Sequence, residues 1–74
     1  IWSDYRLKTN IIPIGESKSG INIYHYNYIW SNKKYRGVIA QELLKTHPKA
    51  VDTRLGFYCV DYDMIDVNFK KVED

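Results

Sequence analysis

The chain has one cysteine, two histidines and no long apolar run, and each scarcity removes a class of protein. A single cysteine, Cys59, excludes an intrachain disulfide. His25 and His47 are far apart and have no cysteine pair beside them, so we expect neither a structural metal nor a cofactor. No apolar run approaches the roughly 20 residues that span a bilayer, and no signal-peptide pattern is visible, so we expect no membrane partner.

An excess of charge is also missing. Eleven lysines and arginines against nine acidic residues give a net charge of +2, and the basic residues are scattered. Nucleic acid is therefore not an expected partner. The chain is rich in aromatic residues instead, with seven tyrosines and two tryptophans. A module that stacks single-stranded bases on these rings is a weaker hypothesis, because the charge does not support it.

Seventy-four residues form one domain at most. A chain of this length buries only about 60% of the surface that it exposes when unfolded, so its core is marginal. Without a disulfide or a metal, association with further copies is the remaining means of stabilisation. We therefore expect a homo-oligomer.

The pattern of apolar residues predicts an α+β fold. Residues 21–30, INIYHYNYIW, alternate as a strand, and the row of Tyr24, Tyr26, Tyr28 and Trp30 is expected in the core or at a subunit interface. We predict a small antiparallel sheet that contains 21–30 and 56–62, with a helix over 39–47 packed on it. Residues 63–72 fit either period, and Asp63 as an N-cap favours a short C-terminal helix.

Three stretches carry the most specific signal: SDYRLK at 3–8, GVIAQE at 37–42 followed by HPKAV at 47–51, and VDYDMI at 60–65. In this order they resemble the intramolecular chaperone, or auto-processing, domain at the C-terminus of phage tail spikes and fibres, the S74 peptidase family. The resemblance extends from Ser3 to about Phe69.

The resemblance implies a homotrimer that assists folding of an upstream fibre or spike of the same polypeptide and then cuts itself off. Residues 1–2 would end that upstream segment, and residues 3–74 would form the chaperone domain. The implied nucleophile is Ser3, the implied base is Lys8, and the implied cleavage site is the Trp2–Ser3 bond. The implied location is the virion tail fibre or its precursor, assembled in the host cytoplasm.

The implied chemistry sets a requirement on Lys8. A serine hydroxyl needs a base, and a lysine serves as one only when burial lowers its pKa. We expect an enclosed trimer to supply that burial. Gln41 is expected either to support the site, as an oxyanion donor or by holding the Ser3 loop, or to be an ordinary polar side chain in the first turn of a helix. His25 is expected as a structural histidine or a supporting catalytic one.

One alternative function stays open. The family's long C-terminal helix has no counterpart in the dozen residues after VDY, and Ile1 and Trp2 still precede Ser3. The missing helix predicts a weaker trimer or one held mainly by the sheet. The retained Ile1 and Trp2 favour a non-cleaving trimeric cap at a fibre tip, whereas the presence of both Ser3 and Lys8 favours the Ser–Lys self-cleaving peptidase.

Overall fold

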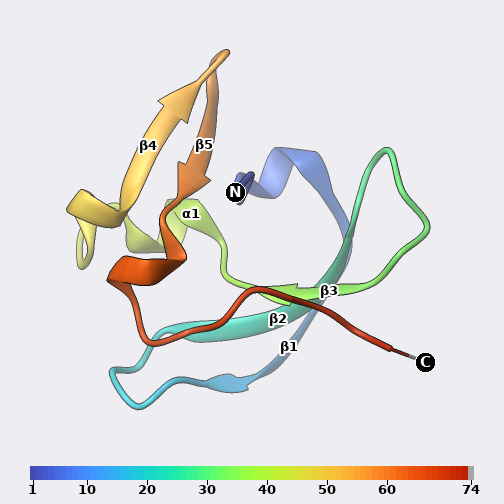
Figure 1. Ribbon diagram of the computed structural model, residues 1–74, viewed down its shortest axis with the longest axis horizontal. Coiled ribbons are helices and arrows are strands. Elements are labelled where there is room, and N and C mark those ends of the chain that lie inside the picture. Colours follow the sequence, from blue (N-terminus) through green and yellow to red (C-terminus); the bar gives the residue numbers. More distant parts are fainter. Residues whose placement is uncertain (74) are drawn as a thin grey trace.

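The computed structural model describes residues 1–73, and it places two small antiparallel sheets around one short α-helix (Figure 1). The elements in chain order are η1 (Tyr5–Leu7), β1 (Lys8–Glu16), β2 (Asn22–Tyr28), β3 (Tyr35–Gly37), α1 (Ala40–Leu43), η2 (Pro48–Ala50), β4 (Val51–Arg54), β5 (Phe57–Val60), η3 (Tyr62–Met64) and β6 (Lys70–Lys71), where η denotes a 3-10 helix. The predicted mixture of a sheet and a helix is confirmed, and the details differ in three places.

The larger sheet has the order β1-β2-β3-β6, with all neighbours antiparallel. Its second strand confirms the strand predicted over 21–30. Pro13 lies in β1, at the edge of the sheet, where a missing backbone donor is tolerated. The core joins this sheet to the rest of the molecule. It consists of Ile21, Ile23, Val38, Ala40, Leu43, Val60 and Val67.

The second sheet is a hairpin of β4 and β5, which projects away from the larger sheet in Figure 1. The prediction that 21–30 and 56–62 share one sheet is therefore wrong. The free edge of β5 pairs instead with the start of the chain, where Trp2 forms an antiparallel bridge with Cys59. The Val60 amide donates to the Ile1 carbonyl at 2.9 Å, and the Ser3 amide donates to the Tyr58 carbonyl at 3.1 Å.

The helix predicted over 39–47 is shorter than expected, because α1 ends at Leu43. The chain then turns, and His47 adopts a non-helical backbone conformation directly before Pro48. A proline disfavours the helical conformation in the residue before it. Ala40 and Leu43 are buried, whereas Leu44 is 40% exposed.

The predicted C-terminal α-helix is absent from residues 63–73, and this prediction is wrong. Asp61, not Asp63, caps the single 3-10 turn of η3, and its side chain accepts from the Asp63 amide at 3.0 Å. The following residues are held by distant partners. Asp66 accepts hydrogen bonds from Ser19, and Phe69 stacks on Tyr35. These contacts outweigh the weak helix propensity of Asp66, Val67 and Asn68.

No helix among residues 1–73 has the length and apolar character that a bilayer-spanning segment needs.

Candidate functional site

The two residues predicted as nucleophile and base lie together in the interior of a single chain. Ser3 is 0% exposed and Lys8 is 6% exposed. The turn η1 lies between them, and Asp4 caps it by accepting from the Arg6 amide at 2.9 Å. This turn reverses the chain, so that a residue five positions after Ser3 can reach back to it.

The amino group of Lys8 is enclosed by carbonyl oxygens and an aromatic ring. Its Nζ donates to the Ser3 carbonyl at 3.0 Å and to the Val38 carbonyl, and it lies 4.2 Å from the centre of the Tyr26 ring. Burial lowers the pKa of Lys8 to about 7, while the charges of Asp4 and Glu42 oppose that shift. The burial that we expected from a trimer is therefore already supplied by one chain.

Ser3 is fixed at both main-chain groups. Its carbonyl accepts from the Ala40 amide at 2.8 Å as well as from Lys8, and its amide pairs with β5. Its side-chain Oγ lies 3.3 Å from the Tyr62 hydroxyl. Among residues 1–73, no hydrogen bond joins Ser3 Oγ directly to Lys8 Nζ. The lysine thus contacts the backbone of the serine, and the hydroxyl is held by a tyrosine.

The carbonyl just before Ser3 has a partner of its own. The hydroxyl of Tyr28 donates to the Trp2 oxygen at 2.5 Å. Burial raises the pKa of Tyr28 to about 12, which keeps this donor protonated at neutral pH. The Trp2–Ser3 bond therefore lies between a tyrosine donor on one side and the Ser3–Lys8 pair on the other.

Asp4 is the centre of the hydrogen bonds that hold the Ser3 loop. Its fully buried carboxylate accepts from Arg6 Nε at 3.0 Å and Arg6 Nη2 at 2.8 Å, from the Tyr58 amide at 3.1 Å and from Gln41 Nε2 at 2.7 Å. The bonds from Arg6 hold the pKa of this carboxyl well below its usual range.

Gln41 spans this loop and α1. Besides its bond to Asp4, its Oε1 accepts from the Tyr5 amide at 3.1 Å. Of the roles considered for it, this geometry matches the one that holds the Ser3 loop. Its amide nitrogen points to Asp4.

The GVIAQE stretch is explained by these same contacts. Val38 donates its amide to the Tyr62 hydroxyl at 2.9 Å and accepts from Lys8, and Ala40 donates to Ser3. Gly37 is required because a Cβ there would lie 2.8 Å from the Tyr26 hydroxyl and nearer still to the Tyr62 hydroxyl. The stretch thus forms one wall of the site with backbone atoms.

We predict that Gly37→Ala destabilises the protein. The added methyl group has no room between the two buried tyrosine hydroxyls, and overpacking of this kind costs about 1–3 kcal/mol. Urea unfolding measures the loss. Ser31→Ala, in the turn after β2, is the control. Gly20→Ala would not serve, because Gly20 has a positive φ that alanine adopts only with strain. An unchanged unfolding midpoint in Gly37→Ala would contradict this packing.

The structure places His25 away from this cluster. It pairs with Ile12 and Arg36 in the sheet. Strand alternation puts it on the opposite face of β2 from Tyr26 and Tyr28, the two tyrosines that reach the site. This position matches the structural histidine among the two roles that we considered.

Sequence reasoning gave no role in the site to four residues that form it: Asp4, Tyr26, Tyr28 and Tyr62. Asp4 and Tyr62 belong to the SDYRLK and VDYDMI stretches, so the signal was present without a role attached. Tyr26 and Tyr28 are buried, as expected for the aromatic row, whereas Trp30 is exposed.

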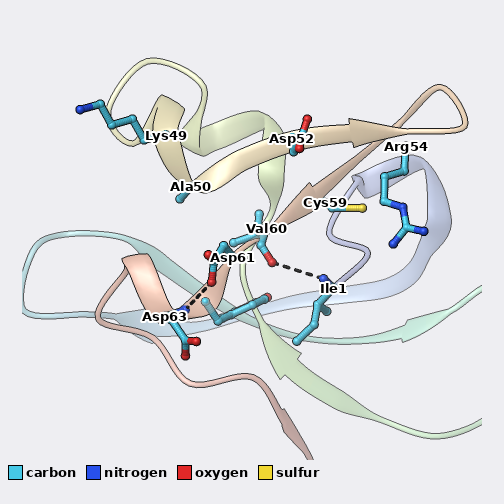
Figure 2. Close-up of a pocket in the computed structure, with 10 residues that line it drawn as sticks. Ile1, Lys49, Ala50, Asp52, Arg54, Cys59, Val60, Asp61 and Asp63 are labelled. Carbon is cyan, nitrogen blue, oxygen red and sulfur yellow. Dashed lines mark hydrogen bonds between the residues drawn. The ribbon is translucent and has the colours of Figure 1, made fainter.

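An open pocket lies beside Ile1 and the hairpin of β4 and β5. Figure 2 shows the Ile1 amino group bonded to the Val60 carbonyl at its edge, with Lys49, Asp52 and Asp63 around it. Cys59 also faces this pocket and is half-buried. Within residues 1–73, no three acidic, histidine or cysteine side chains come together in a way that would hold a metal ion.

Comparison with known families assigns the chain. Residues 3–52 match the Peptidase_S74 family, described as the chaperone of endosialidase, and the chain belongs to this family. The match begins at Ser3 and includes Lys8 and the GVIAQE stretch, whereas the VDYDMI stretch lies beyond it. No curated protein and no solved structure matched significantly.

Proposed function

We propose that this domain is a C-terminal intramolecular chaperone that trimerises, assists folding of a preceding tail fibre or spike, and releases itself by cutting the Trp2–Ser3 bond. The observation that carries the proposal is the buried Lys8 amine, which contacts the Ser3 carbonyl and has a pKa near neutrality. The family's description supports the chaperone role.

The chemistry of the cut follows from the position of the nucleophile. Ser3 contributes the nitrogen of the bond to be broken, so attack by its own Oγ on the Trp2 carbonyl closes a small ring. The reacting atoms are always within reach. Effective concentrations in well-oriented intramolecular reactions reach about 10⁵–10⁸ M. The required motion is a rotation of Oγ away from Tyr62.

Trimerisation is proposed from the apolar side chains left at the surface. Ile12, Ile14, Ile29 and Trp30 lie on β1 or directly after β2, and each is more than 40% exposed. A marginal core with this much exposed apolar surface gains stability by association. Sedimentation equilibrium should show a trimer, and a stable monomer at micromolar concentration would contradict it.

The cut is tested by placing a folded reporter domain before Ile1. The wild type should separate into two pieces, the smaller beginning at Ser3 by N-terminal sequencing. Ser3→Ala should remain whole, because no hydroxyl attacks the Trp2 carbonyl. Ser31→Ala is the matched control and should be cut at the wild-type rate, since among residues 1–73 the Ser31 side chain bonds only to the Lys33 amide, and alanine keeps the bond from the Ser31 backbone amide to the Tyr28 carbonyl. A cut elsewhere, or a cut in Ser3→Ala, would contradict the proposal.

One observation favours the non-cleaving cap as a second candidate. Ser3 Oγ rests on the Tyr62 hydroxyl and is not bonded to Lys8 within the described chain. A permanent bond of this kind would make Ser3 a structural residue. An uncut wild type that is trimeric would decide for the cap.

A further inference from the structure

The Trp2 carbonyl has a tyrosine hydroxyl as its donor. Tyr28 Oη lies 2.5 Å from this oxygen, which is the oxygen that would become negatively charged when Ser3 attacks. Of the hydroxyls described, that of Tyr62 pairs with Ser3 Oγ and Val38, and that of Tyr24 pairs with Glu42. Tyr28 therefore has a position that its neighbours on the same strand do not share.

We propose that Tyr28 is a catalytic residue of the self-cleavage reaction, in which its hydroxyl stabilises the oxyanion formed on the Trp2 carbonyl. This inference rests on the proposed function. A donor aimed at the atom on which charge develops, in a place from which water is excluded, is among the strongest catalytic contributions that one side chain makes.

The position of this hydroxyl is fixed by packing before any reaction occurs. The Tyr28 ring stacks on Trp30 at 4.9 Å, meets the edge of Tyr26 at 5.4 Å and contacts Tyr35 at 5.3 Å. Three aromatic contacts leave the ring little freedom, so the donor does not need to reorganise during the reaction. Phenylalanine at this position would keep the same ring contacts and lose only the hydroxyl.

The proposed step balances as follows. Ser3 Oγ forms a bond to the Trp2 carbonyl carbon, its proton passes to the neutral Lys8 amine, and the carbonyl π electrons move to the oxygen that Tyr28 holds. The C–N bond then breaks, and Lys8 returns the proton to the Ser3 nitrogen. The resulting ester is hydrolysed by water to a Trp2 carboxylate and a free Ser3 hydroxyl.

The experiment measures the first-order rate of cleavage in the reporter-linked protein for wild type, Tyr28→Phe, Tyr24→Phe and Ser3→Ala. Tyr28→Phe should be cut about 10²–10³-fold more slowly, as when one oxyanion donor is removed. Tyr24→Phe is the matched control, since it loses a tyrosine hydrogen bond on the same strand. It should be cut at the wild-type rate at a pH where Lys8 is neutral, because its partner Glu42 acts only on the Lys8 pKa. Near-ultraviolet circular dichroism checks that both variants are folded.

The pH dependence of the cleavage rate distinguishes a catalytic role of the Tyr28 hydroxyl from a purely structural one. Tyr28→Phe should be cut more slowly by the same factor at every pH. The midpoint of its pH–rate profile should equal that of the wild type, because Lys8 stays buried. A shifted midpoint or an unfolded Tyr28→Phe would mean that the hydroxyl only maintains packing, and would overturn this inference. If Tyr28→Phe is cut at the wild-type rate while Ser3→Ala stays uncut, the role of Tyr28 is overturned and the proposed self-cleavage is retained. An uncut wild type would remove both.

Discussion

Lys8→Met is expected to abolish cleavage and at the same time to stabilise the fold at and below neutral pH. Methionine has nearly the length of lysine and carries no charge, so it fills the same space beneath Tyr26 without accepting the Ser3 proton. The cost of burying an ammonium group, which lowers the Lys8 pKa to about 7, disappears with it. Cleavage by gel and unfolding by urea measure the two effects.

The sign of the pH dependence follows from that lowered pKa. Cleavage by the wild type should rise with pH and level off above about 7, because only the neutral amine accepts a proton. Stability should rise as well between about pH 7 and 9. In that range the unfolded chain binds a proton at Lys8 that the folded protein does not, so the slope approaches ~1.4 kcal/mol per pH unit. Lys8→Met should show neither trend.

Two acidic groups bear on this profile, since the charges of Asp4 and Glu42 favour the ammonium form. Glu42→Gln should therefore move the cleavage midpoint to lower pH. A wild-type rate that is flat between pH 5.5 and about 8.5 would show that Lys8 is not the base. A Lys8→Met protein that is cut normally would show the same.

Asp4→Ala is expected to cause the largest loss of stability of any single change in the site. The carboxylate is fully buried and accepts five hydrogen bonds, from Arg6, Tyr58 and Gln41. Removing it takes the acceptor from the Tyr58 backbone amide and the Gln41 side-chain amide, both of which are partly buried. Each donor left unpaired in this way typically costs about 1–3 kcal/mol, so the two together are a large share of the stability of a small domain, while the half-exposed Arg6 turns to water. Thermal unfolding measures it.

Asp52→Ala is the matched control, since Asp52 is exposed and accepts only from the neighbouring Thr53 amide. It should change stability by less than about 0.5 kcal/mol. The lowered pKa of Asp4 adds an acid signature: the stability that its carboxylate contributes is present above about pH 4 and is lost as the pH falls further. Equal effects of Asp4→Ala and Asp52→Ala would contradict the role of Asp4.

The parts of the fold that sequence predicted are those fixed by local pattern. Alternation over 21–30 indicated β2 because each residue there meets a neighbour on a defined face. The division into two sheets escaped prediction because β5 pairs with residues 1–3, and Ile1 and Val60 are 59 positions apart, so no local periodicity indicates that pairing. The C-terminal helix was wrong for the same reason, since Asp66 and Phe69 are held by Ser19 and Tyr35.

The sequence indicated two residues of the candidate site, Ser3 and Lys8, but not the contacts that surround them. The resemblance of the SDYRLK, GVIAQE and VDYDMI stretches to the S74 family pointed to Ser3 and Lys8, and the structure brings the two residues together through the Ser3 carbonyl. The contributions of Val38 and Ala40 are backbone atoms, which any residue provides, so side-chain identity could not reveal them. Tyr28 was hidden among similar tyrosines, because only its position opposite Trp2 distinguishes it.

The antiparallel pairing of Ile1, Trp2 and Ser3 with β5 has a consequence for kinetics. The Trp2–Ser3 bond is an internal part of the fold, and the Tyr28, Tyr62 and Lys8 groups described around it belong to the same polypeptide. A peptide added from outside would have to break this pairing and displace Ser3, which is 0% exposed. If the cut occurs within one chain, its half-life should be unchanged by thousand-fold dilution, and an uncut Ser3→Ala protein mixed with wild type should stay uncut. A half-life that lengthens on dilution would instead place assembly before chemistry.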